Sequence, residues 1–199
     1  RQMCIRDRRL PLLDLTIPAL RSSSATECQQ LFKCVNGLAK ADGDFSLAEF
    51  VLYLVLWHRL QPWINPKQEH KIQYTNLGQV WSDCLILLSA LAQVGQTSQD
   101  AIVYAFRSGA YRLPGVSQQT LPETPPAFNI GQLHQSLKRL GLASGKLKQA
   151  VVDACAHTVL LDNVVTVQEA DVLRAIAITL DCPLPPFLNP KASQLKIGK

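Results

Sequence analysis

A short pattern that occurs twice constrains the fold more than any other feature of the sequence. The first copy, ADGDFSLAE, spans residues 41–49, and a weaker copy, LDNVVTVQE, spans residues 161–169. Both copies fit the pattern Asp-(Gly/Asn)-x-(Phe/Val)-(Ser/Thr)-x-x-Glu, in which x is any residue. Each copy follows an apolar stretch with helical spacing and leads into another. The pattern therefore predicts a helical hairpin that is used twice.

The residue types in the pattern are those that end one helix and start the next. Gly43 and Asn163 tolerate the left-handed conformation in which a helix commonly ends. The Ser or Thr hydroxyl can accept a hydrogen bond from the backbone of the Glu that follows, whose carboxylate can accept from the Ser or Thr N–H. Two capping boxes are expected, each stabilising its helix by about 1 kcal/mol. They consist of Ser46 with Glu49 and of Thr166 with Glu169.

The same acidic residues also permit a metal site, because carboxylate oxygens are the ligands that hard cations such as calcium and magnesium prefer. The spacing differs from that of an EF-hand loop, which needs its bidentate Glu at position 12. We therefore favour capping over metal binding. The candidate ligands are Asp42, Asp44 and Glu49, with Asp162 and Glu169 in the second copy.

Helical periodicity extends along most of the chain, and no strand-like alternation competes with it. The sequence predicts an all-α bundle of about seven or eight helices, with helical hairpins repeated in two halves. Residues 10–20, interrupted by prolines, are expected to form a short helical or extended lead-in, and residues 61–67 a turn at Pro62 and Pro66. Helices are expected at about 25–40, 47–60, 76–94, 97–112, 129–140, 146–161 and 167–180.

Composition suggests how the chain is divided. Residues 113–128 are rich in proline, so we expect a linker between a first helical subdomain, 10–112, and a second, 129–188. Residues 1–9 lack a periodic apolar face, and MCIRDR resembles translated sequencing-adapter read-through. We expect a non-native or disordered leader on a piece of a longer protein. Residues 189–199 are expected to form a mobile basic tail.

The net charge of +5 and the pI of about 9.0 arise at the two ends of the chain, and the body between them is close to neutral. A near-neutral body has no basic face that follows phosphates, so we expect no nucleic-acid partner. The longest apolar runs, residues 50–57 and 85–94, are shorter than the roughly 20 residues of a membrane span. We therefore expect the fragment itself to be soluble.

No catalytic residue is predicted. The six cysteines form no C-x-x-C pair and are expected to be reduced thiols that pack as small hydrophobic residues. Cys155 and His157 could be half of a zinc site, but no second pair at ligand spacing accompanies them. The histidines belong to no H-E-x-x-H motif, and nucleophile-elbow, phosphate-loop and dinucleotide motifs are absent from the sequence.

Three blocks resemble the C-terminal region of bacterial HtpX-like membrane zinc metallopeptidases, in order and spacing, from about Arg9 to Phe187. The blocks are RLPLLDLTIPALR, KADGDFSLAEFVLYLVL and DACAHTVLLDNVVTVQEADVLRAIAITLDCPLPP. The acidic turns also resemble TerB-like helical domains, which are linked to tellurite resistance and stress response. The first copy matches the acidic positions of that family, whereas the second departs from them at Asn163 and Val164.

The first resemblance implies a parent enzyme with membrane helices and an H-E-x-x-H zinc site upstream of Arg1. This chain would then be a non-catalytic domain on the cytoplasmic side of the bacterial inner membrane, with a regulatory, docking or assembly role. Its partners would be the membrane and peptidase region of its own parent chain and protein substrates. Zinc is expected only in the parent enzyme. The alternatives are a free-standing TerB-like module that binds a divalent cation in a stress response, and a structural helical scaffold.

Overall fold

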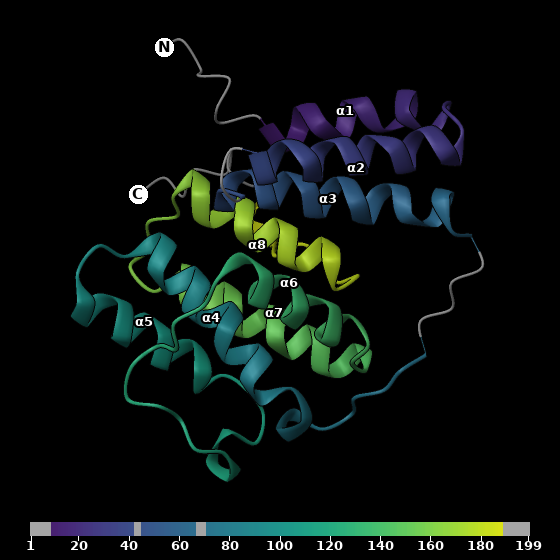
Figure 1. The fold of residues 1–199 in the computed structure, drawn as a ribbon. Helices are drawn as coiled ribbons and strands as arrows, with labels where there is room; N and C mark the ends of the chain where they lie inside the picture. Colours follow the sequence, from purple (N-terminus) through teal and green to yellow (C-terminus); the bar gives the residue numbers. More distant parts are fainter. Residues whose placement is uncertain (1–8, 42–44, 67–70, 189–199) are drawn as a thin grey trace. The chain divides into compact units, whose positions relative to one another are not determined.

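The computed structural model describes residues 9–41, 45–66 and 71–188, which form eight α-helices joined by loops and short 3-10 turns (Figure 1). In this part of the chain the single β-type pairing is an isolated bridge between Tyr74 and Ala143. The prediction of an all-α fold with seven or eight helices is confirmed. The expected basic tail and, apart from Arg9, the expected leader lie outside the described residues.

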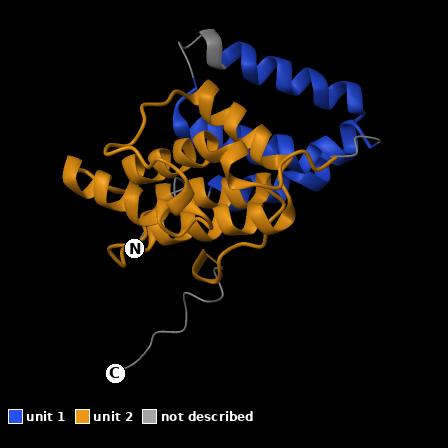
Figure 2. Cartoon of the chain, turned by 90° about the horizontal axis from the view of Figure 1, so that it is seen from below, with its two compact units in different colours: residues 1–70 blue, residues 71–199 orange. Residues whose placement is uncertain are grey.

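The chain divides into two compact units, residues 1–70 and 71–199 (Figure 2). The sequence suggested a boundary at residues 113–128 instead, but that Pro-rich segment belongs to the second unit. Long-range hydrogen bonds hold it there: the Ser89 hydroxyl donates to the Pro126 carbonyl at 2.7 Å. The Trp81 indole likewise donates to the Thr120 carbonyl at 3.2 Å. Hydrogen bonds between residues 37 and 39 positions apart cannot be predicted from local composition.

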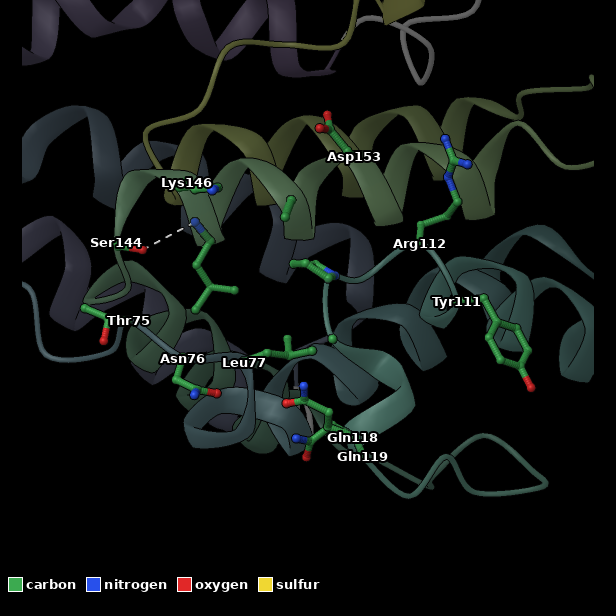
Figure 3. A pocket seen from close by; sticks show the side chains of 14 residues that line it. Thr75, Asn76, Leu77, Tyr111, Arg112, Gln118, Gln119, Ser144, Lys146 and Asp153 are labelled. Atoms are coloured by element: carbon green, nitrogen blue, oxygen red, sulfur yellow. Dashed lines mark hydrogen bonds between the residues drawn. The ribbon is translucent and has the colours of Figure 1, made fainter.

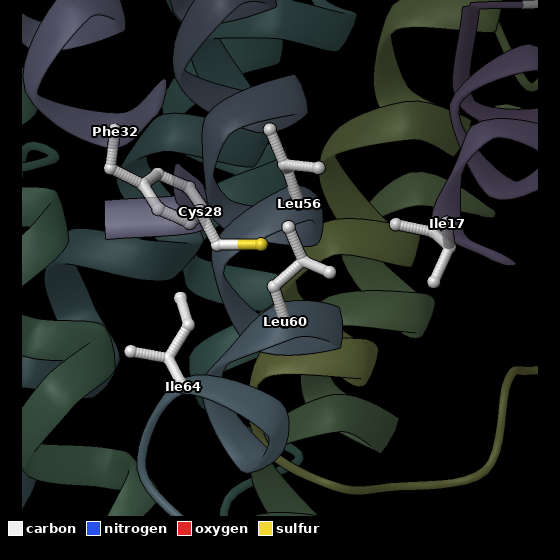
Figure 4. Close-up of a cluster of buried hydrophobic side chains, with 6 residues drawn as sticks. All are labelled: Ile17, Cys28, Phe32, Leu56, Leu60 and Ile64. Carbon is white, nitrogen blue, oxygen red and sulfur yellow. The ribbon is translucent and has the colours of Figure 1, made fainter. Parts of the chain in front are cut away.

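The first unit contains α1 (Arg9–Arg21), α2 (Ala25–Ala41) and α3 (Leu47–Ile64), and α3 packs against both of the others. Apolar residues at every fourth position of α3 line one face, which packs against α1 and α2. The Phe32 ring lies edge-on to Trp57 with ring centroids 4.8 Å apart. The buried cluster is drawn in Figure 4 and consists of Ile17, Cys28, Phe32, Leu56, Leu60 and Ile64.

Helix α3 continues past the point at which the sequence predicted a turn. The expected turn over residues 61–67 is wrong for its first part, because α3 includes Pro62 and ends at Ile64. Proline removes one helical hydrogen bond, but the buried side chains of Leu60 and Ile64 hold this last turn in place. The Trp63 indole also donates to the Ser23 carbonyl at 3.1 Å, and its ring remains half exposed.

The second unit is arranged around α4 (Trp81–Gly95), which packs against four other helices. Apolar residues cover α4 on all sides, as expected for the central helix of a bundle. The surrounding helices are α5 (Gln99–Ala110), α6 (Ile130–Gly141), α7 (Gly145–Val159) and α8 (Val167–Thr179). The short 3-10 turns are η2 (Leu77–Val80), η3 (Val116–Gln118) and η4 (Pro186–Leu188).

Turn η2 runs directly into α4, and together they make the helical stretch that the sequence predicted at about residues 76–94. Among the described residues this stretch, Leu77–Gly95, is the one helix long and apolar enough to cross a membrane, with a mean hydropathy of 1.4. In the structure 61% of its apolar window is buried within the protein. The central helix of a helical bundle meets the same criteria of length and composition.

The repeated sequence pattern joins two helix pairs, as predicted. Its first copy lies between α2 and α3 in the first unit, and its second copy between α7 and α8 in the second unit. The helices of each pair pack against each other. Asn163 has φ 59°, the left-handed conformation expected at this position. Gly43 lies outside the described residues.

Candidate functional site

Both predicted capping boxes are present. At the start of α3 the Glu49 N–H donates to Ser46 Oγ at 3.3 Å, and Glu49 Oε2 accepts from the Ser46 N–H at 2.9 Å. Hydrogen bonds from the Ser46 hydroxyl and backbone N–H lower the pKa of Glu49 below its usual value. At the start of α8, Thr166 and Glu169 make the same exchange, with the Thr166 N–H to Glu169 Oε2 distance at 2.9 Å.

The two capping carboxylates differ in their surroundings. Glu49 is exposed, whereas Glu169 is only 2% exposed. The Glu169 carboxylate packs against Gly95 at the end of α4. A Cβ atom added at Gly95 would overlap the carboxylate and lie 2.6 Å from its Cδ atom. The glycine therefore leaves the space that the buried carboxylate occupies.

Three of the five candidate metal ligands lie in the described part of the chain, and each of them accepts hydrogen bonds within the protein. Asp42 and Asp44 lie outside the described residues. Asp162 Oδ1 accepts from the Val164 N–H at 3.0 Å, and this bond, with a second one from Gln96, lowers the pKa of Asp162. Glu49 and Glu169 serve as caps. In residues 9–41, 45–66 and 71–188 no three side chains of His, Cys, Asp or Glu are grouped as a metal site requires.

Cys155 and His157 do not form half of a zinc site in this structure. Residues two positions apart on a helix point in different directions, and here Cys155 is buried while His157 is half-buried at the surface of α7. Burial raises the pKa of the Cys155 thiol, and it raises that of Cys84 to about 12. Cys84 and Cys155 pack in the core, as the sequence predicted, whereas Cys34 is exposed.

The sequence did not predict a contact between Ser108 on α5 and His157 on α7. Ser108 Oγ lies 3.0 Å from His157 Nε2, within the range of a nucleophile and its general base. Burial, with a contribution from the charge of Arg112, lowers the pKa of His157 below its usual 6.5. In the described part of the chain no carboxylate is hydrogen-bonded to Nδ1 of His157. The contact links α5 to α7.

The second unit contains an open pocket of about 750 Å³ that residues far apart in the sequence enclose (Figure 3). The end of α5, the segment after it, the loop before η2 and the first half of α7 each supply part of its wall. Leu77, Leu147 and Pro114 contribute apolar surface, and the remaining side chains are mostly polar. The polar and charged lining residues are Thr75, Asn76, Tyr111, Arg112, Gln118, Gln119, Ser144, Lys146 and Asp153.

One wall of the pocket is fixed by Arg139 of α6. Its Nε donates to Asp83 Oδ2 at 2.9 Å, Nη1 to the Tyr74 hydroxyl at 3.1 Å and Nη2 to the Gln79 carbonyl at 2.9 Å. The guanidinium also lies 4.8 Å from the centre of the Tyr74 ring. Arg139 therefore holds both ends of the segment 74–79, which carries lining residues from Thr75 to Leu77.

A second contact attaches the same wall to α7. The Gln73 N–H donates to the Leu142 carbonyl at 2.8 Å, and the Ser144 N–H donates to the Tyr74 carbonyl at 2.8 Å. Ser144 is the N-cap of α7, where its hydroxyl accepts from the Leu147 N–H at 3.4 Å. The loop before η2 and the start of α7 thus form one connected wall.

The fold is all-α, and the second unit contains an open pocket with a mostly polar lining. Comparison of the chain with protein-family models, curated proteins and solved structures yields no match.

Proposed function

We propose that the chain is the helical C-terminal domain of a bacterial membrane zinc metallopeptidase, where it docks polypeptide substrates and does not cut them. In this proposal it lies on the cytoplasmic side of the inner membrane and works with the peptidase region of its own parent chain. The three blocks that resemble HtpX-like enzymes support this family. The observation that carries the docking role is the open pocket in the second unit.

The pocket suits a polypeptide because its wall combines apolar and amide side chains. Gln118 and Gln119 can each donate and accept hydrogen bonds, as the peptide groups of a bound segment require. Among the described residues neither side chain is hydrogen-bonded, so both are available to a ligand. Leu77 and Leu147 offer apolar surface to a side chain of that segment.

Hydrolysis would then belong to the parent enzyme. A zinc ion bound in the parent enzyme would supply Lewis-acid chemistry for that reaction, and its ligands are expected in the part of the parent that precedes Arg1. No residue of this chain is assigned to the zinc. The carboxylates of Glu49 and Glu169 act in helix capping.

The assignment is tested by translating the source DNA upstream of the Arg1 codon in frame. We expect an H-E-x-x-H motif on a helix, between apolar spans of about 20 residues each. A start codon close to Leu10, with no zinc motif before it, would overturn the assignment to a membrane peptidase.

The non-catalytic role is tested with casein. The isolated chain is expected to leave casein intact over a period in which the parent enzyme degrades it. Degradation of casein by the isolated chain, in a preparation freed of other peptidases, would overturn this part of the proposal.

A further inference from the structure

We propose that the pocket of the second unit binds an extended, acidic polypeptide segment and that a carboxylate of this segment lies against Lys146. The inference rests on the docking role for its choice of a polypeptide, and it adds the charge, the conformation and the orientation of the ligand. It follows from the dimensions of the pocket, from its apolar floor of Leu77 and Leu147, from its rim of Gln118 and Gln119, and from the charges of the lining residues.

The dimensions fit a short stretch of extended chain. Lys146, Ala150 and Asp153 follow the helical spacing that places residues on one face of α7, and all three line the pocket. The rise of an α-helix places the first and last of them roughly 10 Å apart along the axis. An extended chain rises about 3.3 Å per residue, so α7 spans about three residues of a ligand. The volume of about 750 Å³ lies within the range of ligand pockets, roughly 300–1,000 Å³.

The floor accepts an apolar side chain. Leu77 and Leu147 are only 7% and 5% exposed, and the exposed Pro114 lies beside them. Figure 3 shows Leu77 between the two labelled glutamines and α7. A ligand whose side chains alternate in direction, as those of an extended chain do, can place one side chain on this floor and the next toward the rim.

The charge distribution selects an acidic ligand. Lys146 and Arg112 both line the pocket, and within the described residues neither forms an ion pair. Asp153 is the single acidic side chain of the lining, and its Oδ1 accepts from the Gln149 amide at 2.9 Å. The pocket wall therefore carries more positive than negative charge.

The end of the pocket at Lys146 is the more favourable place for a carboxylate. Asp153 lies about two helical turns away along α7. Lys146 is in the first turn of α7 beside the N-cap Ser144 (Figure 3). The positive end of the helix dipole adds there to the charge of the lysine. Arg112 lines the pocket at the end away from Lys146 (Figure 3).

The test measures fluorescence anisotropy of a fluorescein-labelled hexapeptide of alternating glutamate and leucine, titrated with the whole chain. A matched hexapeptide carries glutamine in place of glutamate. We expect the acidic peptide to bind several-fold more tightly, and Lys146→Gln to weaken its binding by about fivefold, as one exposed ion pair allows. Gln119→Ala should weaken the binding of both peptides.

Lys138→Gln is the control variant, since Lys138 is an exposed lysine of α6 that does not line the pocket. It removes the same charge and should leave the affinity unchanged. Equal affinity for the two peptides, or an equal loss in Lys138→Gln and Lys146→Gln, would overturn the inference. Full displacement of the peptide by sodium acetate at constant ionic strength would also overturn it, because the site would then hold a simple anion.

The inference and the proposed function fail separately. If an upstream zinc motif is found and the acidic peptide does not bind, the accessory domain stands and the pocket inference falls. If the peptide binds in a manner that depends on Lys146 and no zinc motif is found upstream, the inference stands and the metallopeptidase assignment falls.

Discussion

Replacing Gly95 by alanine will place a methyl group where the buried carboxylate of Glu169 now lies. The added Cβ atom would overlap the carboxylate and lie 2.6 Å from Cδ and 3.2 Å from Cγ of Glu169. Since Glu169 is almost fully buried, it cannot simply move into solvent. We expect Gly95→Ala to displace the carboxylate and break the capping box at the start of α8.

The size of the effect follows from three terms. Overpacking costs about 1–3 kcal/mol, and the loss of a cap costs about 1 kcal/mol. The better helix propensity of alanine recovers no more than about 1 kcal/mol at the last residue of α4. The expected decrease in the free energy of unfolding of the second unit is about 2 kcal/mol.

Urea denaturation, followed by the fluorescence of Trp81, measures this decrease in the unit that contains the substitution. The measurement uses a Trp57→Phe, Trp63→Phe background, because these two tryptophans belong to the first unit. Gly141→Ala is the matched control: Gly141 ends α6 as Gly95 ends α4, and an added Cβ there meets nothing within 4 Å.

A double-mutant cycle identifies the cause. In a Glu169→Ala background, Gly95→Ala should cost close to nothing, because the carboxylate that obstructs the methyl group is gone. The reasoning is refuted if Gly95→Ala is as mild as Gly141→Ala, or if its cost is the same in both backgrounds.

Three other substitutions test features that the structure assigns. Arg139→Lys should destabilise the second unit by about 1–2 kcal/mol, because the single nitrogen of lysine cannot replace the three nitrogens with which Arg139 binds Asp83, Tyr74 and Gln79; an unchanged urea midpoint would contradict this. Ser46→Ala should cost about 1 kcal/mol whether or not calcium is present, and a loss seen only with added calcium would favour the metal site over the cap. Because burial lowers the pKa of His157 below 6.5, the unfolded chain binds its proton more tightly. Stability should therefore be complete above about pH 6.5 and fall as the pH decreases through the folded-state pKa. His157→Gln should lose less stability between about pH 7 and 5 than the unsubstituted chain, and identical pH profiles would contradict the assignment.

The parts of the structure that depend on neighbours in the sequence could be predicted. The bonds of Ser46 with Glu49 and of Thr166 with Glu169 join residues three positions apart, so the residue types alone indicate them. The helices and both helical hairpins follow from apolar spacing in the same way. Asn163 takes the backbone conformation that its residue type allows.

The parts that depend on packing could not be predicted. The same sequence pattern gives an exposed Glu49 and a buried Glu169, and the difference comes from Gly95, which is distant in the sequence. The Pro-rich segment appeared to be a linker, but the hydroxyl of Ser89 fixes it to α4. The pocket joins residues from 75 to 153 and exists only when α5 and α7 are assembled.

The wall formed by residues 73–76 lies at the start of the second unit, a few residues after the first unit ends at residue 70. Where the chain enters this unit, the Tyr74 carbonyl accepts a hydrogen bond from the Ser144 N–H, and the Tyr74 hydroxyl accepts one from Arg139. Thr75 and Asn76, which line the pocket, follow immediately. The contacts that anchor the chain where it enters the second unit are therefore also the contacts that hold one wall of the pocket. Weakening these contacts would loosen the entry of the chain and the pocket wall together.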